Sequence, residues 1–160
     1  VGGAYINASA IRNGVHNRGG EFGHMVIHPG GKQCLCGKKG CFEAYVSEKV
    51  LSSELDMTLD NFFELAAQGN KNNSNVLDEY MDNLALGINN IYTMMDCDIV
   101  LGGTVAPYLK QYDNSIKERL VNDYSFDTDA DYLKISDDGG GKSGLGAALS
   151  FVARFIDGVE

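Results

Sequence analysis

The chain has 160 residues, of which 44% are hydrophobic, and its 22 acidic side chains outnumber 13 basic ones to give a formal net charge of −9. A chain of this length can bury one sizeable core, so we expect one domain. No stretch approaches the roughly 18 consecutive apolar residues of a membrane span, and no secretory leader is present, which predicts a cytoplasmic protein. Because phosphate contacts require clustered Lys and Arg, the acidic balance argues against nucleic-acid binding by this segment.

The N-terminal part of the chain is predicted to form short strands. Two are expected over residues 3–6 and 8–12, joined by a turn near Asn7. A third is expected over residues 25–28 and should end at Pro29-Gly30.

The next part is predicted to be helical. Residues 42–55 carry Val46, Val50 and Leu51 on one helical face. Thr58 is placed to cap a helix over residues 59–68, and Gly69 should end that helix. We interpret the polar residues 70–75 as a linker.

A long helix is predicted over residues 76–95. Its apolar side chains are spaced three or four apart and so form one stripe, a pattern typical of a helix packed on a core. The stripe consists of Leu77, Met81, Leu84, Ile88, Ile91 and Met95.

The last third is predicted to alternate strand and helix. A buried strand over residues 98–101 leads into Gly102-Gly103, and a helix follows with Pro107 in its first turn. A second strand is expected over residues 132–136, and a final helix over residues 144–155.

A potential metal site is formed by one residue directly before the third strand and three cysteines in the loop after it. His24, Cys34, Cys36 and Cys41 provide one imidazole and three thiolates, the ligand set of a closed structural zinc site. The glycines of the loop (Gly30, Gly31, Gly37 and Gly40) would let it fold over the metal. The alternative is a disulfide pair with two unrelated residues, although a Cys34–Cys36 bond would close a strained ring. Cys97 is expected to be a small buried hydrophobic residue.

The same loop resembles the signature of the ROK family, which groups bacterial sugar kinases with sugar-responsive transcriptional repressors. The resemblance rests on GEFGH at 20–24, CLCG at 34–37 and GCFE at 40–43. It implies a zinc loop, at about residues 24–41, beside a sugar pocket. In that pocket sugar hydroxyls would be contacted by Glu21, His24 (which also binds zinc) and Glu43. Outside such a motif the two glutamates would be interpreted as ordinary solvated carboxylates.

The resemblance covers nearly the whole chain and implies an α/β fold, one half of the actin-like, ribonuclease-H-like ATPase fold. LGGTVA at 101–106 is similar to the adenosine-side turn of the family, and SDDGGGKSGLGAAL at 136–149 is similar to its closing segment. The initial Val-Gly-Gly would be the end of a phosphate turn. Nucleotide contacts are thus implied for Gly2, Gly3, Gly102, Gly103 and Thr104. Without the family, the glycine turns could equally be simple loop closures.

In a ROK kinase the catalytic aspartate and the first phosphate loop, of D-x-G-x-T type, belong to an N-terminal domain. Residues 1–160 contain no such sequence, and neither Asp137 nor Asp138 is placed to replace the aspartate. We therefore expect a C-terminal domain that is inactive alone, cut from a longer protein.

Two kinds of full-length protein would contain such a domain. One is a kinase that uses ATP and Mg²⁺ to phosphorylate a hexose or an N-acetylhexosamine, and the other is a zinc-containing, sugar-binding repressor. We favour the kinase because of the glycine turns. A third interpretation is a zinc-stapled dimerisation module. We also expect a homodimer, because the apolar stripe would otherwise remain partly exposed.

Overall fold

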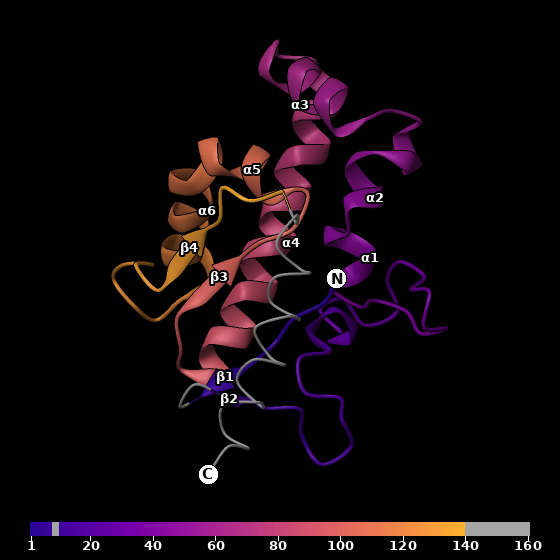
Figure 1. Cartoon of the computed structure of the whole chain (residues 1–160). Coiled ribbons are helices and arrows are strands. Elements are labelled where there is room, and N and C mark those ends of the chain that lie inside the picture. Colours follow the sequence, from indigo (N-terminus) through magenta and orange to yellow (C-terminus); the bar gives the residue numbers. More distant parts are fainter. Residues whose placement is uncertain (8–9, 140–160) are drawn as a thin grey trace, which may run out of the picture.

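The computed structural model describes residues 1–7 and 10–139, and the final helix predicted over residues 144–155 lies outside them. A long helix runs through the middle of the molecule, with short helices on both sides and a small parallel sheet beside it (Figure 1). Among the described helices, none is long and apolar enough to cross a membrane.

The central helix is α4, Lys71–Met95. The side-chain oxygen of Asn70 accepts hydrogen bonds from the backbone N–H groups of Asn72 and Asn73, at 3.1 and 3.3 Å. This cap starts the helix five residues earlier than predicted. The linker expected over residues 70–75 is therefore wrong, because its asparagines cap and form the first helical turn.

The apolar stripe of α4 lies in the hydrophobic core. Leu77, Met81, Leu84 and Ile88 are buried, whereas Ile91 is half-buried. Among the described elements, α4 packs against α1 (Glu43–Val46), α2 (Glu48–Leu51), α3 (Leu59–Ala67), α6 (Asp113–Arg119) and the π-helical turn η4 (Leu120–Tyr124).

The helix predicted over residues 42–55 is broken into α1, α2 and the 3₁₀-helix η2, Ser53–Leu55. The break lies at Ser47, whose backbone is extended with φ −69° and ψ 154°. A break normally leaves a helical carbonyl without its partner. Here the buried Tyr80 hydroxyl donates to the Val46 carbonyl at 2.9 Å, so this carbonyl keeps a partner at the break.

Helix α3 forms as predicted. The Thr58 hydroxyl accepts a hydrogen bond from the backbone N–H of Asn61 at 3.3 Å, and α3 ends at Ala67, one residue before the predicted end. Gly69 follows with φ +79°, the left-handed conformation that ends many helices.

The first N-terminal strand is shorter than predicted, and the turn expected near Asn7 is wrong because Asn7 lies within that strand. Strand β1, Ile6–Asn7, pairs antiparallel with β2, Ala10–Ile11. The strand expected over residues 25–28 is wrong, since it is only an isolated bridge between Val26 and Cys41. The backbone N–H groups of Ile27 and His28 both donate to the Gly40 carbonyl, at 2.9 and 3.2 Å. A regular ladder cannot continue past one carbonyl that is shared in this way.

The second sheet confirms the expected alternation of strand and helix. Strand β3, Ile99–Leu101, pairs in parallel with β4, Leu133–Ile135. The expectation of a buried β3 strand is wrong, since Val100 is 71% exposed. In a strand successive side chains point to opposite faces, and the face that carries Val100 is uncovered by the described residues.

The connection between β3 and β4 is a series of short helices. The regular helix expected after Pro107 is divided into α5 (Ala106–Leu109), η3 (Lys110–Tyr112), α6 and the π-helical turn η4 (Leu120–Tyr124). Ile116 and Leu120 of this series are fully buried.

Candidate metal centre and adjoining cavity

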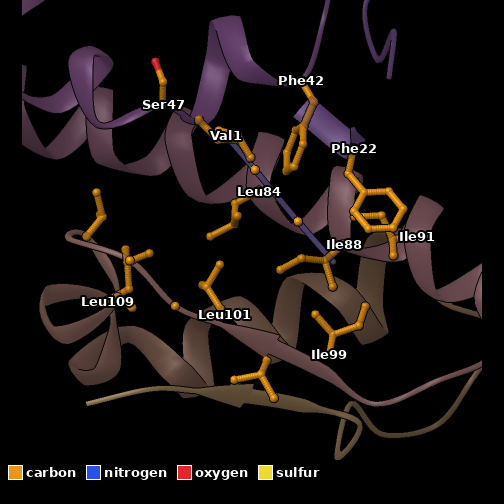
Figure 2. Close-up of a pocket in the computed structure, with 18 of the residues that line it drawn as sticks. Val1, Phe22, Phe42, Ser47, Leu84, Ile88, Ile91, Ile99, Leu101 and Leu109 are labelled. Atoms are coloured by element: carbon orange, nitrogen blue, oxygen red, sulfur yellow. The ribbon is translucent and has the colours of Figure 1, made fainter. Parts of the chain in front are cut away.

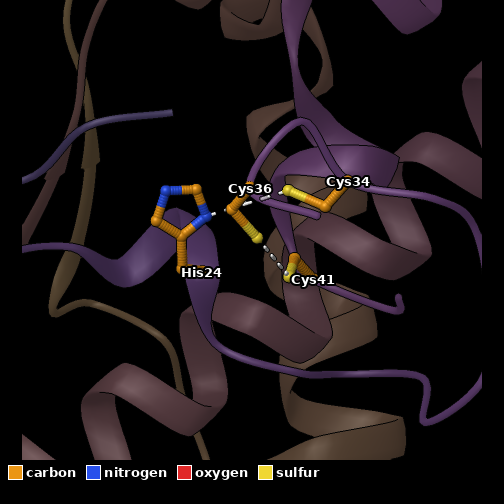
Figure 3. Close-up of side chains that lie close together, drawn as sticks. All are labelled: His24, Cys34, Cys36 and Cys41. Carbon is orange, nitrogen blue, oxygen red and sulfur yellow. Dashed lines mark hydrogen bonds between the residues drawn. The ribbon is translucent and has the colours of Figure 1, made fainter. Parts of the chain in front are cut away.

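The four predicted metal ligands lie together in the structure. The Sγ atoms of Cys34, Cys36 and Cys41 and a ring nitrogen of His24 are all within 4.8 Å of one another. Cys36 Sγ is 3.7 Å from Cys41 Sγ, and Cys34 Sγ is 3.8 Å from His24 Nδ1 (Figure 3). These atoms could hold one metal ion.

The spacing fits a tetrahedral zinc ion. Zinc–sulfur bonds of about 2.3 Å at tetrahedral angles place neighbouring ligand atoms about 3.8 Å apart. The distances from Cys36 to Cys41 and from Cys34 to His24 match this value. A disulfide would need a sulfur–sulfur distance of about 2.05 Å. All four cysteines are free, so the disulfide interpretation is wrong.

The loop that carries the cysteines is held by two turns. The Gly31 N–H donates to the His28 carbonyl at 2.9 Å across Pro29 and Gly30, and Gly30 has φ +79°. This arrangement is the proline–glycine signature of a type II turn. The second turn is closed by the Gly37 N–H, which donates to the Cys34 carbonyl at 3.0 Å. The turns bring the ligands together.

Two features of the structure require glycine at position 40. Its φ of +83° is rarely adopted by other residues, and a Cβ built on it would lie 1.8 Å from the His28 carbonyl oxygen. That close approach places Cys41 directly beneath the loop.

The base of the loop is tied to helices α1 and α4 by side chains that the sequence analysis did not single out. His28 Nε2 lies 2.6 Å from Oδ1 of Asn83, a buried residue of α4. The Tyr45 hydroxyl accepts from the Lys32 backbone N–H at 2.8 Å. The Lys32 ammonium group lies 3.2 Å from Glu79 of α4. In the sequence these residues belong to no recognisable motif, except that Tyr45 follows Cys41, the last cysteine of the loop, by four positions.

The thiols differ in their environment. Hydrogen bonding from the Lys38 backbone lowers the pKa of Cys36, with the Cys34 side chain as the second cause. Burial raises the pKa of Cys41 to about 12. Burial thus favours the protonated thiol of Cys41. A bound metal ion would reverse this preference, because coordination stabilises the thiolate. Cys97 is only half-buried, contrary to expectation, and burial raises its pKa as well.

His24 lies between the cysteines and two carboxylates. Its Nδ1 atom faces Cys34 and also lies 3.9 Å from Glu43 Oε2, whereas its Nε2 atom lies 3.9 Å from Glu21 Oε2. The side chains of His24 and Glu21 are 42% and 60% exposed, so both are accessible to a ligand. Glu43 is more buried, at 24%, and its Oε1 atom lies 3.2 Å from the Val1 backbone nitrogen.

The N-terminal segment leads from this cluster into a cavity of about 860 Å³ (Figure 2). The cavity lies between α4, β3 and the N-terminal segment. Its interior is apolar and is lined by Phe22, Phe42, Leu84, Ile88, Ile99 and Leu101, among others. All five residues that were assigned to nucleotide binding also line it: Gly2, Gly3, Gly102, Gly103 and Thr104.

A second cavity, of about 610 Å³, adjoins the first. Glu48, Ser52, Ser53 and Thr104 line both. The Thr104 hydroxyl donates a hydrogen bond to Glu48 Oε2 at 2.5 Å, so this pair lies where the two cavities meet. The sequence analysis did not single out Glu48.

Comparison with known proteins agrees with the motif and the fold. The family model described as "ROK family" matches residues 1–153. The chain belongs to the ROK family. The xylose repressor of Bacillus spizizenii is 31% identical over 124 residues, which are 74% of this chain and 32% of the repressor. The N-acetylmannosamine kinase of Escherichia coli O1:K1 is 30% identical over 111 residues, which are 66% of this chain and 38% of the kinase. The chain thus spans about a third of the length of these relatives.

Solved structures of ROK proteins share the fold, which is actin-like. A ROK glucokinase from Streptomyces griseus, in complex with glucose and AMPPNP, superposes with a TM-score of 0.75 at 22% identity, over 94% of this chain and 56% of that one. A ROK hexokinase from Thermus thermophilus gives a TM-score of 0.63 at 25% identity, over 75% of this chain and 43% of that one. The present chain therefore has relatives among both kinases and repressors.

Proposed function

We propose that this chain is the C-terminal domain of a ROK sugar kinase that transfers the γ-phosphate of ATP to a hexose or an N-acetylhexosamine. The kinase part of the proposal is supported by the glycine turns that line the large cavity. The sugar-binding part is carried by the position of His24, with Nδ1 toward Cys34 and Nε2 toward Glu21. One side chain thereby joins the metal cluster to an accessible polar group.

The proposed zinc ion is held by His24, Cys34, Cys36 and Cys41. Zinc bound at one ring nitrogen would fix the tautomer, so that the other nitrogen is a hydrogen-bond donor. His24 Nε2 then donates to a sugar hydroxyl, while Glu21 and Glu43 accept from neighbouring hydroxyls. This combination of one donor and two acceptors distinguishes sugars by the orientation of their hydroxyl groups.

The proposed nucleotide contacts are the glycine turns that line the large cavity. Gly2 and Gly3 lie in the segment that starts beside Glu43, and Gly102, Gly103 and Thr104 belong to the opposite wall. In this proposal the sugar cluster adjoins the glycine turn at Gly2 and Gly3, because the Val1 nitrogen lies 3.2 Å from Glu43 Oε1. ATP would bind with Mg²⁺, and the residue that deprotonates the sugar hydroxyl would come from a separate N-terminal domain. Residues 1–160 alone should therefore be inactive.

A second candidate is the sugar-binding domain of a repressor. It has its own support in the Glu48 carboxylate, which accepts a hydrogen bond from Thr104 in the turn proposed to lie against the adenosine of a nucleotide. In this alternative the zinc loop and the sugar cluster keep their roles, and no phosphate is transferred.

The proposed protein is a cytoplasmic homodimer without nucleic-acid contacts from this domain. Several exposed apolar side chains support a self-association surface, among them Val100, Met94 and Phe126, each more than 70% exposed. Light scattering at tens of micromolar should give twice the monomer mass, and a monomer would contradict this part of the proposal.

The full-length protein can be tested with a panel of hexoses and N-acetylhexosamines, by measuring both sugar binding and sugar-dependent ADP release. A kinase should release ADP with one sugar or a few related sugars. Sugar binding without ADP release would favour the repressor. Failure to bind any sugar in the zinc-loaded protein would contradict both the kinase and the repressor. The zinc loop would then have only a structural role.

A further inference from the structure

We propose that Cys36 is an oxidation site, and that a peroxide joins it to Cys41 in a disulfide that removes two of the metal ligands. The inference rests on the proposed zinc site and adds a chemical modification to it. Because the two cysteines are half of the four-residue cluster, their oxidation also frees His24 from the metal.

The cysteines of the cluster differ in their access to solvent. Cys36 is exposed, whereas the side chains of Cys34 and Cys41 are 4% and 0% exposed. Cys36 lies in an exposed stretch of the loop, residues 35–39, in which Leu35 is 82% exposed. Oxidation follows the exposure of the sulfur, so a dissolved peroxide reaches Cys36 before the other two.

Cys41 is the cysteine best placed to react with an oxidised Cys36. Their Sγ atoms are 3.7 Å apart (Figure 3), compared with about 2.05 Å in a disulfide. Only a small movement of the exposed Cys36 side chain is needed to join them. Cys34 is a poorer partner, because a single residue separates it from Cys36 and a bond between the two would close a strained ring.

The reaction needs a peroxide as its only co-reactant. The Cys36 sulfur takes one oxygen atom from hydrogen peroxide and becomes a sulfenic acid, while the other oxygen leaves as water. The Cys41 thiol then attacks that sulfur. A sulfur–sulfur bond forms, the sulfur–oxygen bond breaks and a second water leaves, so two electrons pass from the thiols to the peroxide. A reducing thiol reverses the bond by exchange.

The disulfide leaves too few ligands for the metal. A structural zinc site uses four protein ligands, and only His24 and Cys34 remain when Cys36 and Cys41 are joined. The His24 ring, whose side chain is 42% exposed, then loses the metal contact that orients it. Oxidation at Cys36 thereby weakens sugar binding without any change in the sugar-binding carboxylates.

Peptide mapping by mass spectrometry under non-reducing conditions tests the inference. Full-length, zinc-loaded protein is treated with hydrogen peroxide, and zinc release is followed with a chromogenic chelator. We expect a Cys36–Cys41 disulfide and about one zinc ion released for each disulfide formed. Dithiothreitol followed by added zinc should reverse both changes. Cys97→Ser is the control and should respond as the wild type does, because Cys97 lies outside the cluster.

Three results would overturn the proposal. The first is a disulfide between Cys34 and Cys41, and the second is zinc release with no disulfide formed. The third is that Cys36 stays reduced at a peroxide concentration that oxidises free cysteine added to the same sample. If the purified protein holds no zinc, the peptide map alone decides, and the same Cys36–Cys41 disulfide is expected.

Sugar affinity, measured on the same samples, separates this inference from the proposed function. The oxidised protein should bind the sugar about tenfold more weakly, because His24 is no longer held by the metal. Unchanged sugar affinity after disulfide formation and zinc release would support the oxidation site and contradict the role of His24 in sugar binding. Sugar binding by protein that forms no disulfide would contradict the oxidation site alone.

Discussion

The ring of Phe42 lies directly against the backbone of Gly87 in the middle of α4. A Cβ built on Gly87 would come within 2.2 Å of Phe42 Cε2. Phe42 follows Cys41, so this contact fixes the end of the metal loop against the central helix. A glycine inside a helix costs about 1 kcal/mol relative to alanine, and here it makes room for the aromatic ring.

Gly87→Ala should therefore destabilise the protein, although alanine is the better helix former. Displacing a buried ring in a packed core costs about 1–3 kcal/mol, which exceeds the gain in helix propensity. Urea denaturation measures the free energy of unfolding. Asn75→Ala, at an exposed position of the same helix, should change it by less than about 0.5 kcal/mol. Greater stability of Gly87→Ala would show that the ring can move freely.

Asn83→Leu should loosen the metal loop, because it leaves His28 without its partner on α4. Because His28 is exposed, water can replace the lost partner, so the cost should be about 1 kcal/mol, the net value of a typical hydrogen bond. Hydrogen exchange should become faster at the Gly31 and Gly40 amides, which this anchor holds in place. Replacing both partners, in His28→Phe with Asn83→Leu, should recover part of the lost stability. No recovery would mean that the pair is not coupled.

Local signals in the sequence predicted the parts of the structure that depend on neighbouring residues. The Thr58 cap, the Pro29-Gly30 turn and the gathering of the cysteines all follow from short spacings and backbone preferences. The asparagines at 70–75 were misassigned because asparagine favours both linkers and helix caps, and only the contacts of Asn70 distinguish the two.

The rest depends on contacts between residues distant in the chain. The helix breaks at Ser47 because Tyr80, 34 residues beyond Val46, supplies a hydrogen bond to the Val46 carbonyl. Glu48 meets Thr104 across 56 positions. Neither partner has a distinctive local pattern, so no reading of nearby residues could pair them.

Tyr108→Phe tests the contact between α3 and α5 through its pH dependence. The Tyr108 hydroxyl donates to Asp60 Oδ1 at 2.5 Å, and this hydrogen bond raises the pKa of Tyr108. A raised pKa means that the contact stabilises the fold below the unfolded tyrosine pKa, near 10, and that this stability is lost as the pH rises through the higher folded value. The variant should thus be less stable than the wild type at pH 8, and the difference should shrink at pH 11. A constant difference would contradict this assignment.

Cys36→Ser should release the proposed metal. Cys36 is the exposed cysteine of the cluster, so serine fits there without disturbing the core. Metal analysis should give one zinc per chain for the wild type and much less for the variant. Cys97→Ser should keep its zinc, because Cys97 lies outside the cluster. Zinc-free wild-type protein, purified without chelator, would contradict the metal site.

Glu43→Ala should weaken sugar binding in the full-length protein while zinc content stays nearly unchanged. A missing acceptor leaves a sugar hydroxyl unpaired, which corresponds to about a ten- to hundredfold loss of affinity. Glu118→Ala is the matched control, since this exposed carboxylate lies on α6, outside the cysteine loop and the sugar cluster. Equal sugar affinity in Glu43→Ala and the wild type would place the sugar elsewhere.

The claim that His24 couples the metal to the sugar is tested most directly by the sugar dissociation constant of the full-length protein before and after zinc removal. The account predicts at least tenfold weaker binding without zinc, because His24 is then no longer fixed in orientation, and recovery when zinc is restored. Circular dichroism should confirm that the zinc-free protein stays folded. An unchanged dissociation constant in folded, zinc-free protein would contradict the coupling.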